Sequence, residues 1–466
     1  MRSDVGEAEM RGGRMRRGGL SAVCVMVGAC IGGQAAVASV SNTVRLSYSA
    51  RQAGMGGVCR SLADDGIAPL CNPAGMGFQE GRTLDLNGAL GLTNLHYEDP
   101  QNDARSGGEG DAGVSGLPDF GFTHHVGHSP FAYGLGFYTY GASRMKYDIN
   151  STLLVSSGSE ATDNNLTLIH QRIMPAVAVQ VTDDLALGAA YVRAYQTTAG
   201  ATPLQFQTTV KPAGIAGEHV FLDADTDGWG QGGAFGALVK LGKRTRAGVS
   251  YTMPMRVKLK GRSEITVRNS PVFAALGIPE GTRANYATSI TWKWPQVLGL
   301  GISHEPNEQW LFAFDWQWFD WSWAADKIEL IFSEGNNALV NSTLQSVTGT
   351  NTIRDQLKLQ LRDAFVYHFG TEYRPSERLA LRAGYIFSTN PVPDGTVRPL
   401  VNGNVQHTIA LGAGTKVRAW DVDVAWSHTY LNEQVVEFSE VQGGENNFSQ
   451  TSAGGDLFSL TLRKRF

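Results

Sequence analysis

Charged residues are scarce in this 466-residue sequence. Asp, Glu, Lys and Arg make up 18% of the chain, whereas roughly 25% is typical of soluble domains. The formal net charge of −4 provides no basic surface for nucleic acid, so no nucleic-acid partner is expected. With 42% hydrophobic and 9% aromatic residues, the protein surface must be unusually apolar or unusually neutral.

Long apolar runs are missing as well. Beyond residue 38 no stretch reaches the roughly 18 apolar residues that indicate a transmembrane helix. The 56 glycines and 17 prolines disfavour a helical bundle or a long coiled coil. The sequence also lacks the G-x-S-x-G, H-E-x-x-H and C-x-x-C motifs. We therefore expect no enzymatic activity, no cofactor and no metal site.

The first 38 residues have the organisation of a secretory signal. Four arginines between residues 11 and 17 precede an apolar core at 20–31, and Ala36-Val37-Ala38 forms an A-x-A cleavage site. The apolar core is short for a membrane anchor, and a lipoprotein signal ending at Cys30 is the other alternative. We expect export and cleavage after Ala38.

Only two of the four cysteines, Cys59 and Cys71, lie beyond this signal. An exported protein enters an oxidising compartment in which cysteines pair readily. A disulfide across the short loop between them and two buried free thiols are both compatible with the sequence.

Polar and apolar residues alternate along much of the remaining chain. In residues 83–92 four leucines share one parity, while Asp85 and Asn87 have the other; residues 310–318 and 420–430 repeat the pattern with Trp, Phe and Val. Such alternation predicts strands with one apolar face. That face packs a core in a soluble sandwich and contacts lipid in an outer-membrane barrel.

About fourteen such segments are present, and bacterial outer-membrane barrels have an even number of strands. They lie near residues 82–94, 116–126, 130–141, 164–182, 184–196, 227–241, 245–261, 284–303, 309–322, 360–374, 378–389, 405–417, 419–430 and 456–466. Tight turns such as 128–130 and 182–184 alternate with long polar stretches such as 197–226 and 323–359. The sequence therefore predicts an all-β fold, a transmembrane antiparallel β-barrel formed by residues 81–466.

The chain stops on Phe466, which shares its parity with Phe458, Leu460 and Leu462. This ending resembles the C-terminal signature that outer-membrane proteins present to the barrel assembly machinery, so that machinery is an expected partner. An ordinary last strand that ends in Phe is the alternative.

Residues 39–80 do not follow the strand rhythm. They contain Ala53-Gly54-Met55-Gly56-Gly57 and Cys71-Asn72-Pro73-Ala74-Gly75-Met76. Glycine allows close packing and tight turns, and Asn-Pro initiates a turn. We expect a compact plug inside the lumen, with a disordered leader as the alternative. The predicted parts are thus a cleaved signal peptide (1–38), a plug (39–80) and a barrel (81–466).

These motifs resemble those of the FadL / TodX family of outer-membrane transporters of hydrophobic compounds. The resemblance rests on residues 49–57, Ala63-Asp64-Asp65 and Asn72-Pro73-Ala74-Gly75. Further matches along the barrel lie at 227–230, 256–261, 294–295, 309–310, 362–365 and 390–393. It implies a fourteen-stranded barrel closed by an N-terminal hatch. It also implies that the outer loops capture ligand, a lumen pocket receives it, and the hatch or a kinked strand opens a lateral route.

The resemblance nominates hatch or gate residues in the plug: Gly56, Gly57, Asp64, Asp65, Asn72, Pro73 and Ala74. The Asn72-Pro73-Ala74 turn matches the hatch motif and is the foremost of them. A purely structural turn is the alternative interpretation.

Basic residues of the barrel are the candidate ligand contacts. Strand parity places five of them on the lumen face: Arg256, Lys258, Lys260, Arg362 and His368. The family's fatty-acid branch holds a carboxylate with two basic residues. Lys358 lies near one of these positions without clear register, and the strand from Leu185 reads Tyr195-Gln196-Thr197 where the other is expected. Alternatively, the basic residues neutralise inward acids and contact lipopolysaccharide.

The predicted function is uptake of hydrophobic compounds, long-chain fatty acids or uncharged hydrocarbons, across the outer membrane of a Gram-negative-type envelope. An apolar pocket offers such molecules a favourable partition that a water-filled pore does not. The expected surroundings are outer-membrane lipid and lipopolysaccharide, and a monomer is expected. The alternatives are a general porin, which needs an open and charge-lined lumen, and a structural or adhesive barrel that uses its long loops.

Overall fold

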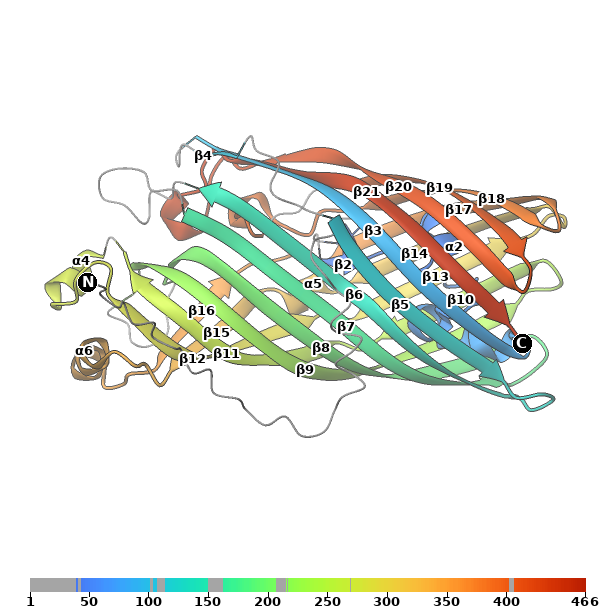
Figure 1. Ribbon diagram of the computed structural model, residues 1–466, viewed down its shortest axis with the longest axis horizontal. Helices are drawn as coiled ribbons and strands as arrows, with labels where there is room; N and C mark the ends of the chain where they lie inside the picture. Colours follow the sequence, from blue (N-terminus) through green and yellow to red (C-terminus); the bar gives the residue numbers. More distant parts are fainter. Residues whose placement is uncertain are drawn as a thin grey trace, which may run out of the picture.

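The computed structural model describes residues 39–40, 43–100, 104–106, 114–149, 162–206, 215, 217–268, 270–401 and 406–466. Within these residues the strands form a closed antiparallel barrel, which confirms the predicted fold class (Figure 1). The wall has 14 staves, where a stave is one crossing of the wall, made by a single strand or by two strands in series. Strand β21 (Gln450–Arg465) closes it by pairing with β3 (Arg82–Asp99) along their whole length. The predicted signal peptide, residues 1–38, lies outside the described residues.

Most staves are single continuous strands. Besides β3 and β21 they are β5 (Val114–His125), β6 (Phe131–Ile149), β7 (Thr162–Gln180), β8 (Leu185–Gln205), β9 (His219–Lys240), β18 (Leu379–Ser388), β19 (Gln406–Val417) and β20 (Trp420–Val435). A short strand, β4 (Ala104–Ser106), pairs with the end of β3.

Four adjacent staves are interrupted part of the way along. Each consists of two strands: β10 (Thr245–Thr252) and β11 (Met255–Val267), β12 (Arg283–Trp294) and β13 (Val297–His304), β14 (Trp310–Phe319) and β15 (Lys327–Ser333), and β16 (Ile353–Lys358) and β17 (Ala364–Ser376). The first two breaks contain Pro254 and Pro295, because proline cannot donate to a strand ladder. Helix α5 (Trp321–Ala324) occupies the third break.

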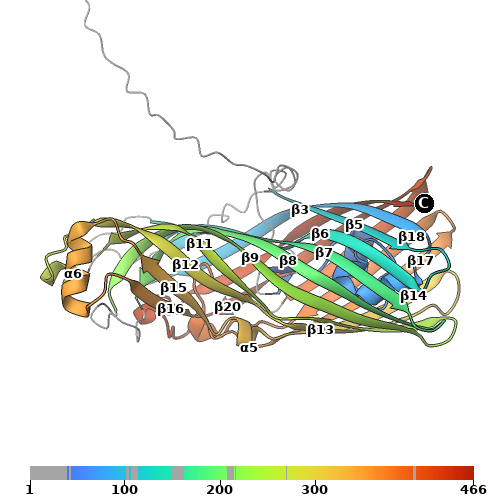
Figure 2. The ribbon, with the colours of Figure 1, turned by 90° about the horizontal axis from the view of Figure 1, so that it is seen from below.

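The two ends of the barrel differ. Tight turns, such as the one between β7 and β8, join strands at one end, where the C-terminus also lies; we call this the turn end. Helices α4 (Pro271–Ala275) and α6 (Ala338–Thr348) lie in the connections at the opposite, loop end (Figure 2). In outer-membrane barrels the short turns face the periplasm. No helix in the described part of the chain has the length and apolarity to cross a membrane.

The predicted alternation of faces is confirmed along most staves. On β3, Leu86 and Leu90 are exposed on the outer surface, whereas Asp85 and Asn87 are buried inside. Several strands run further toward the loop end than predicted; β8 and β9 pair from Thr197↔Asp227 to Gln205↔His219, a region that sequence analysis assigned to a loop. Polar residues are compatible with strand pairing beyond the apolar band, so no alternation marks these extensions.

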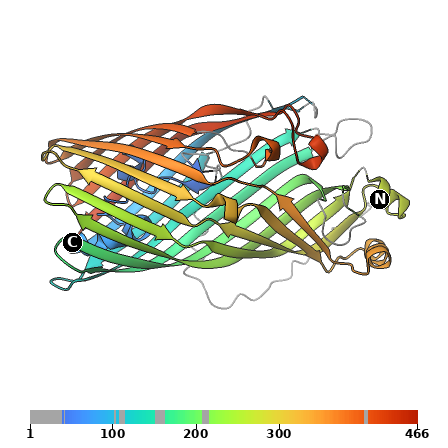
Figure 3. The ribbon, with the colours of Figure 1, turned by 180° about the vertical axis from the view of Figure 1, so that it is seen from behind.

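The N-terminal part of the described chain runs inside the barrel. We call residues 43–80 the inner segment; it contains β2 (Val44–Arg45), α2 (Ala50–Gly54), α3 (Ala68–Cys71) and the 3₁₀ helix η1 (Pro73–Phe78), and β2 pairs with β1 (Ser39–Val40). Figure 3 shows these elements within the turn end of the barrel. The Ser49 hydroxyl caps α2, and the Asn72 side chain caps η1 by accepting from the Ala74 N–H at 3.1 Å.

Candidate functional site

The Asn72-Pro73-Ala74 turn joins the inner segment to the barrel wall. The side-chain amide of Asn72 donates to the carbonyls of Arg60 (2.9 Å) and of Ala237 on β9 (3.0 Å). Asn72 is fully buried, so each of these hydrogen bonds satisfies a group that water does not reach. One side chain therefore ties together two parts of the inner segment and one strand.

Glycines of the wall make room for this turn. A side chain at Gly236 of β9 would place its Cβ 2.0 Å from the Asn72 Oδ1, and one at Gly188 of β8 would lie 2.3 Å from the Ala74 nitrogen. A Cβ at Gly248 of β10 would lie 2.2 Å from the Arg60 carbonyl oxygen. Since the inner segment lies this close to the wall, a side chain at any of these three positions would collide with it.

A second close contact surrounds Gly56 and Gly57. Both have positive φ, 64° and 83°, which only glycine adopts readily. The Gly56 carbonyl lies 2.7 Å from Nδ1 of His368, and Gly56 approaches the backbone of β18 at Gly384. His368 is therefore inward-facing, but it contacts the inner segment and not a ligand cavity.

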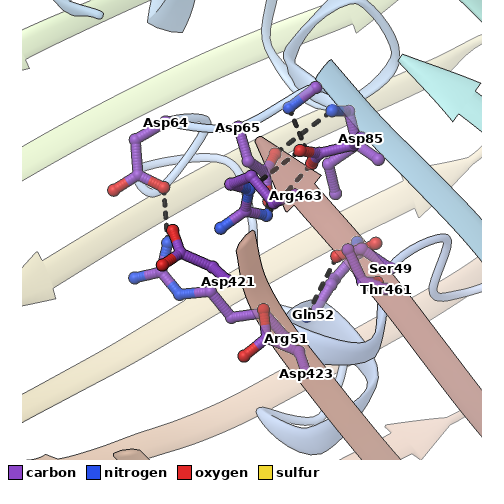
Figure 4. Close-up of polar contacts among 12 residues, drawn as sticks. Ser49, Arg51, Gln52, Asp64, Asp65, Asp85, Asp421, Asp423, Thr461 and Arg463 are labelled. Atoms are coloured by element: carbon purple, nitrogen blue, oxygen red, sulfur yellow. Dashed lines mark hydrogen bonds and ion pairs between the residues drawn. The ribbon is translucent and has the colours of Figure 1, made fainter. Parts of the chain in front are cut away.

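Ion pairs add to this attachment at the turn end. Arg51 of α2 pairs with Asp64 and with Glu372 of β17. Figure 4 shows the pair of Arg51 with Asp64. Arg382 of β18 then bridges Glu372 and Asp423, both at 2.7 Å. Burial raises the pKa of Asp64, but the neighbouring Arg51 and Arg246 guanidiniums outweigh it and hold that pKa below its ordinary value. Asp64 is therefore ionised when the inner segment is in place.

Asp65 belongs to a separate buried group. Its carboxylate lies 2.9 Å from Arg463 of β21, which also pairs with Asp85 of β3 at 2.9 Å (Figure 4). Two carboxylates thus share one guanidinium. Burial, reinforced by the charges of Asp85 and Asp64, raises the pKa of Asp65 to about 7.

Cys59 and Cys71 are joined by a disulfide in the structure. It closes the loop that carries Asp64 and Asp65, and Asn72 follows it directly. Both cysteines are buried. The bond therefore fixes the start of the Asn72-Pro73-Ala74 turn relative to the acidic pair.

The loop end contains an apolar cavity of about 200 Å³, which we call the loop-end cavity. Its apolar lining includes Leu168, Ile290, Trp292, Trp321, Leu359 and Leu361. Trp321 belongs to α5, and the two leucines lie between β16 and β17. The strand interruptions therefore supply much of the apolar surface. At the third and fourth of them the chain leaves the wall and places apolar side chains in the lumen.

Leu168 and Thr198 line this cavity, and a layer of buried polar and aromatic side chains lies on their turn-end side. The Gln196 Oε1 accepts from the Trp294 indole at 2.8 Å and lies 3.3 Å from the His170 ring. Arg172 stacks on Tyr140, with its Cζ 3.3 Å from the ring centroid. Tyr140 also lines a smaller cavity next to the inner segment. The layer thus lies between the loop-end cavity and most of the inner segment, whose first residue, Thr43, also lines the cavity.

The barrel wall is incomplete between β5 and β6. Their pairing ends at Phe120↔Phe137, although β6 continues to Ile149 beside β7. The register of β6 shifts between Thr139 and Gly141, which marks a bulge at the same level. The Asp119 carboxylate and Arg45 of the inner segment span this place by hydrogen bonds to Thr139.

The predicted lumen positions of Arg256, Lys258 and Lys260 are wrong. All three side chains are exposed, and Met255, Val257 and Leu259 point inward instead. Five residue steps from Thr252 to Val257 face four steps from Ala234 to Gly230 on β9. This extra residue, next to Pro254, shifts every later side chain to the opposite face. Arg256 lies over the ring of Trp323 on the outer surface.

Two further basic candidates are also outside the lumen. Lys358 and Arg362 are exposed, and Leu359 and Leu361 between them line the loop-end cavity. The strand pattern ends at Lys358 and resumes at Ala364, so extrapolating parity back from β17 to Arg362 fails. The prediction of a ligand site among these basic residues is therefore not supported by their positions.

Sequence reasoning missed five buried arginines: Arg45, Arg172, Arg382, Arg398 and Arg463. Arg172 lies on β7 with His170 and Leu168 on one parity, a signal that was available in the sequence. Arg398 lies in a predicted loop, and nothing in its local sequence indicates burial. Among the described residues, no group of three His, Cys, Asp or Glu side chains is placed to hold a metal ion.

Comparison with known proteins gives the family. Residues 29–466 match the family described as outer membrane protein transport protein (OMPP1/FadL/TodX). Outer membrane protein NMB0088 of Neisseria meningitidis serogroup B is 25% identical over 275 residues, 55% of this chain and 56% of that protein. The long-chain fatty acid transport protein of Escherichia coli O6:H1 is 24% identical over 244 residues, 52% of this chain and 50% of that protein. The chain thus matches about half the length of these curated relatives.

Solved structures share the fold. A Pseudomonas aeruginosa FadL homologue superposes with a TM-score of 0.70 at 17% identity, covering 91% of this chain and 99% of that one. The Pseudomonas putida toluene transporter TodX gives 0.68 at 19% identity, covering 90% and 98%. Together with the match over residues 29–466, the barrel and its inner segment lead to one conclusion: the chain belongs to the outer membrane protein transport protein (OMPP1/FadL/TodX) family.

Proposed function

We propose that this protein carries hydrophobic compounds into the cell across the outer membrane. The observation that carries the proposal is the combination of an apolar cavity at the loop end with a tightly packed inner segment at the turn end. A greasy molecule partitions into such a cavity because apolar surface leaves water. Both long-chain fatty acids and hydrocarbons are candidate substrates, which the names of relatives for fatty acid and for toluene transport support.

The inner segment is the proposed hatch. Its Asn72-Pro73-Ala74 turn, Gly56 and Gly57 contact wall strands directly, and Asp64 and Asp65 take part in ion pairs with the wall or its neighbours. This packing argues against a general porin, which needs an open lumen. An adhesive barrel has no use for an apolar cavity inside the lumen.

Two exits from the lumen are compatible with the structure. The incomplete wall between β5 and β6 offers a lateral route that leaves the hatch in place. Movement of the inner segment would instead open the turn end. The lateral route requires breaking the contacts that Asp119, Arg45 and Thr139 make across this place, including the hydrogen bond from the Thr139 hydroxyl to the Pro118 carbonyl. Movement of the inner segment breaks many close backbone contacts. We therefore favour lateral release.

We further propose an outer-membrane monomer surrounded by lipid and lipopolysaccharide, inserted by the barrel assembly machinery through the strand that ends at Phe466. The exposed apolar band, including Phe458 and Leu460 on β21, supports contact with lipid.

Binding of a matched ligand pair tests the proposal. Purified protein is exchanged from detergent into an amphipol, because detergent can occupy an apolar cavity. Binding of a long-chain fatty acid and of an alkane with the same number of carbons is then measured. We expect at least one of them to bind, and Leu168→Asp, which puts a charge in the cavity lining, to abolish binding. Leu90→Asp is unsuitable as a control because Leu90 faces lipid. The matched control is Leu339→Asp, at an exposed position of helix α6. Binding of neither ligand would contradict the proposed function.

A further inference from the structure

The loop-end cavity is apolar over most of its lining, but Arg398, Asn164 and Glu445 are among its lining residues, and we call these three the polar region. Asn164 lies near the first residue of β7, at the loop end, whereas Leu168 lies four residues further along β7, toward the turn end. Arg398 and Glu445 come from the connections that follow β18 and β20. The polar region therefore lies on the outer side of the cavity, and the apolar region lies toward Trp294 and His170.

Arg398 is held in place by its own turn. Its N–H donates to the Val401 carbonyl at 2.9 Å, and the Val401 N–H donates back at 3.0 Å. The same connection is fixed to β20, because the Gln434 amide donates to the Val392 carbonyl and to the Asp394 carboxylate. Arg398 is 6% exposed, so the turn carries a guanidinium into the mouth of the lumen.

Two atoms at this polar region have no hydrogen-bond partner among the described residues. They are Nε of Arg398, a donor, and Oδ1 of Asn164, an acceptor; Asn164 is 5% exposed. The Nη2 of Arg398 makes only a 3.4 Å contact with the Lys358 carbonyl. Buried polar atoms without partners are unfavourable, and a bound group that supplies partners removes that penalty.

The charge around Arg398 is already offset. Burial lowers its pKa to about 10, against the opposing effect of the Asp355 and Glu445 carboxylates, so the guanidinium stays charged at neutral pH. Both acids are themselves buried. An anionic ligand headgroup at this position would be repelled by these two carboxylates, whereas a neutral headgroup would not.

We propose that Arg398 and Asn164 form a headgroup site, and that the substrate is a neutral amphiphile with one hydroxyl or carbonyl group, bound with its headgroup toward the outer loops and its hydrocarbon chain toward Trp294. An oxygen accepts from the guanidinium, and a hydroxyl, where present, donates to Asn164. This inference rests on the proposed function and specifies its substrate class. In this arrangement the polar region binds the headgroup, and the apolar lining binds the hydrocarbon chain.

The test uses three ligands with equal chains, dodecane, dodecan-1-ol and dodecanoate, with amphipol-bound protein at pH 7.5. We expect the alcohol to bind about tenfold more tightly than the alkane, as one or two buried hydrogen bonds allow. The acid should bind no more tightly than the alcohol. In Arg398→Met and in Asn164→Leu the alcohol should lose its advantage while alkane binding persists, which shows that the cavity is still folded. Arg354→Met, at an exposed arginine, is the matched control.

Three outcomes would overturn the headgroup site. The first is equal binding of the alcohol and the alkane to the unaltered protein, and the second is an unchanged preference for the alcohol in Arg398→Met. The third is tightest binding of the acid with loss of that advantage in Arg398→Met, which would make the site a carboxylate site. Each of these still includes ligand binding. Failure of all three ligands to bind would instead contradict the proposed function itself.

Discussion

The two halves of the lumen are built on opposite principles. At the turn end, backbone meets backbone at Gly188, Gly248 and Gly384, and buried ion pairs surround the contacts. At the loop end, four interrupted staves turn apolar side chains inward and leave a cavity of about 200 Å³. Close packing without voids excludes solute, whereas an apolar void receives one. From this difference we expect closure at the turn end and ligand binding at the loop end.

The largest effect is expected where closure depends on the absence of a side chain. In Gly236→Leu the new side chain meets Asn72 and Pro73, so the inner segment must move or the barrel must distort. Overpacking of this kind costs about 3 kcal/mol or more. We expect a large rise in ion conductance in planar bilayers. The control is Gly88→Leu, where a Cβ meets nothing within 4 Å; equal conductance of the two variants would contradict closure by this turn.

Removing the disulfide comes next. Cys59→Ser with Cys71→Ser opens a loop of sequence separation 12, and a crosslink over such a loop contributes about 3 kcal/mol in the chain-entropy model. We expect faster hydrogen exchange in residues 59–71 by mass spectrometry, with no change in β18 or β19. Uniform exchange across the barrel would show that the bond stabilises the whole fold and not the inner segment.

A smaller effect is expected from Asn72→Ala. The substitution leaves the carbonyls of Arg60 and Ala237 without their donor, at a cost of about 2 kcal/mol. Conductance should rise less than in Gly236→Leu, and ligand binding at the loop end should persist. Asn94→Ala, at an exposed position, serves as the control. Loss of binding in Asn72→Ala would break the division between the two halves.

The smallest effect is a dependence on pH. Because the pKa of Asp65 is raised to about 7 from its ordinary value, the folded arrangement favours the protonated carboxyl. This contribution to stability is present below pH 4 and is lost as pH rises through 7. Protection of the amides of residues 59–71 against hydrogen exchange, corrected for the pH dependence of the intrinsic exchange rate, should therefore be lower at pH 8.5 than at pH 6. Asp65→Asn should remove the difference, whereas a difference that survives Asp65→Asn would assign it to another group.

The sequence predicts the outer surface better than the lumen. Alternation identified the lipid face of β3, β14 and β20 because lipid contact selects apolar residues at every second position. The predicted inward positions of Arg256, Lys258 and Lys260 were wrong because one extra residue near Pro254 moves every later side chain to the opposite face of the wall. Apolar residues such as Met255 and Val257 can face either lipid or the lumen, so they did not reveal the shift. Local pattern carries no information about such a shift.

The candidate site shows the same limit. The Asn72-Pro73-Ala74 turn could be singled out because its residues have special backbone and capping properties. Its partners could not, since Gly188 and Gly236 are ordinary strand glycines until the fold places them against it. Arg398 is buried in the connection between the neighbouring strands β18 and β19, and only the tertiary structure places it in the lining of the same cavity as Asn164.

Locating a labelled ligand tests the division of the lumen most directly. Crystals of the protein grown with a long-chain alcohol that carries bromine at its far end would show the bromine by anomalous scattering. We predict a single bromine position in the loop-end cavity among Leu168, Trp292 and Trp321, with the inner segment unmoved. Bromine bound within the turn end, beside Asn72 or Gly236, would contradict the account.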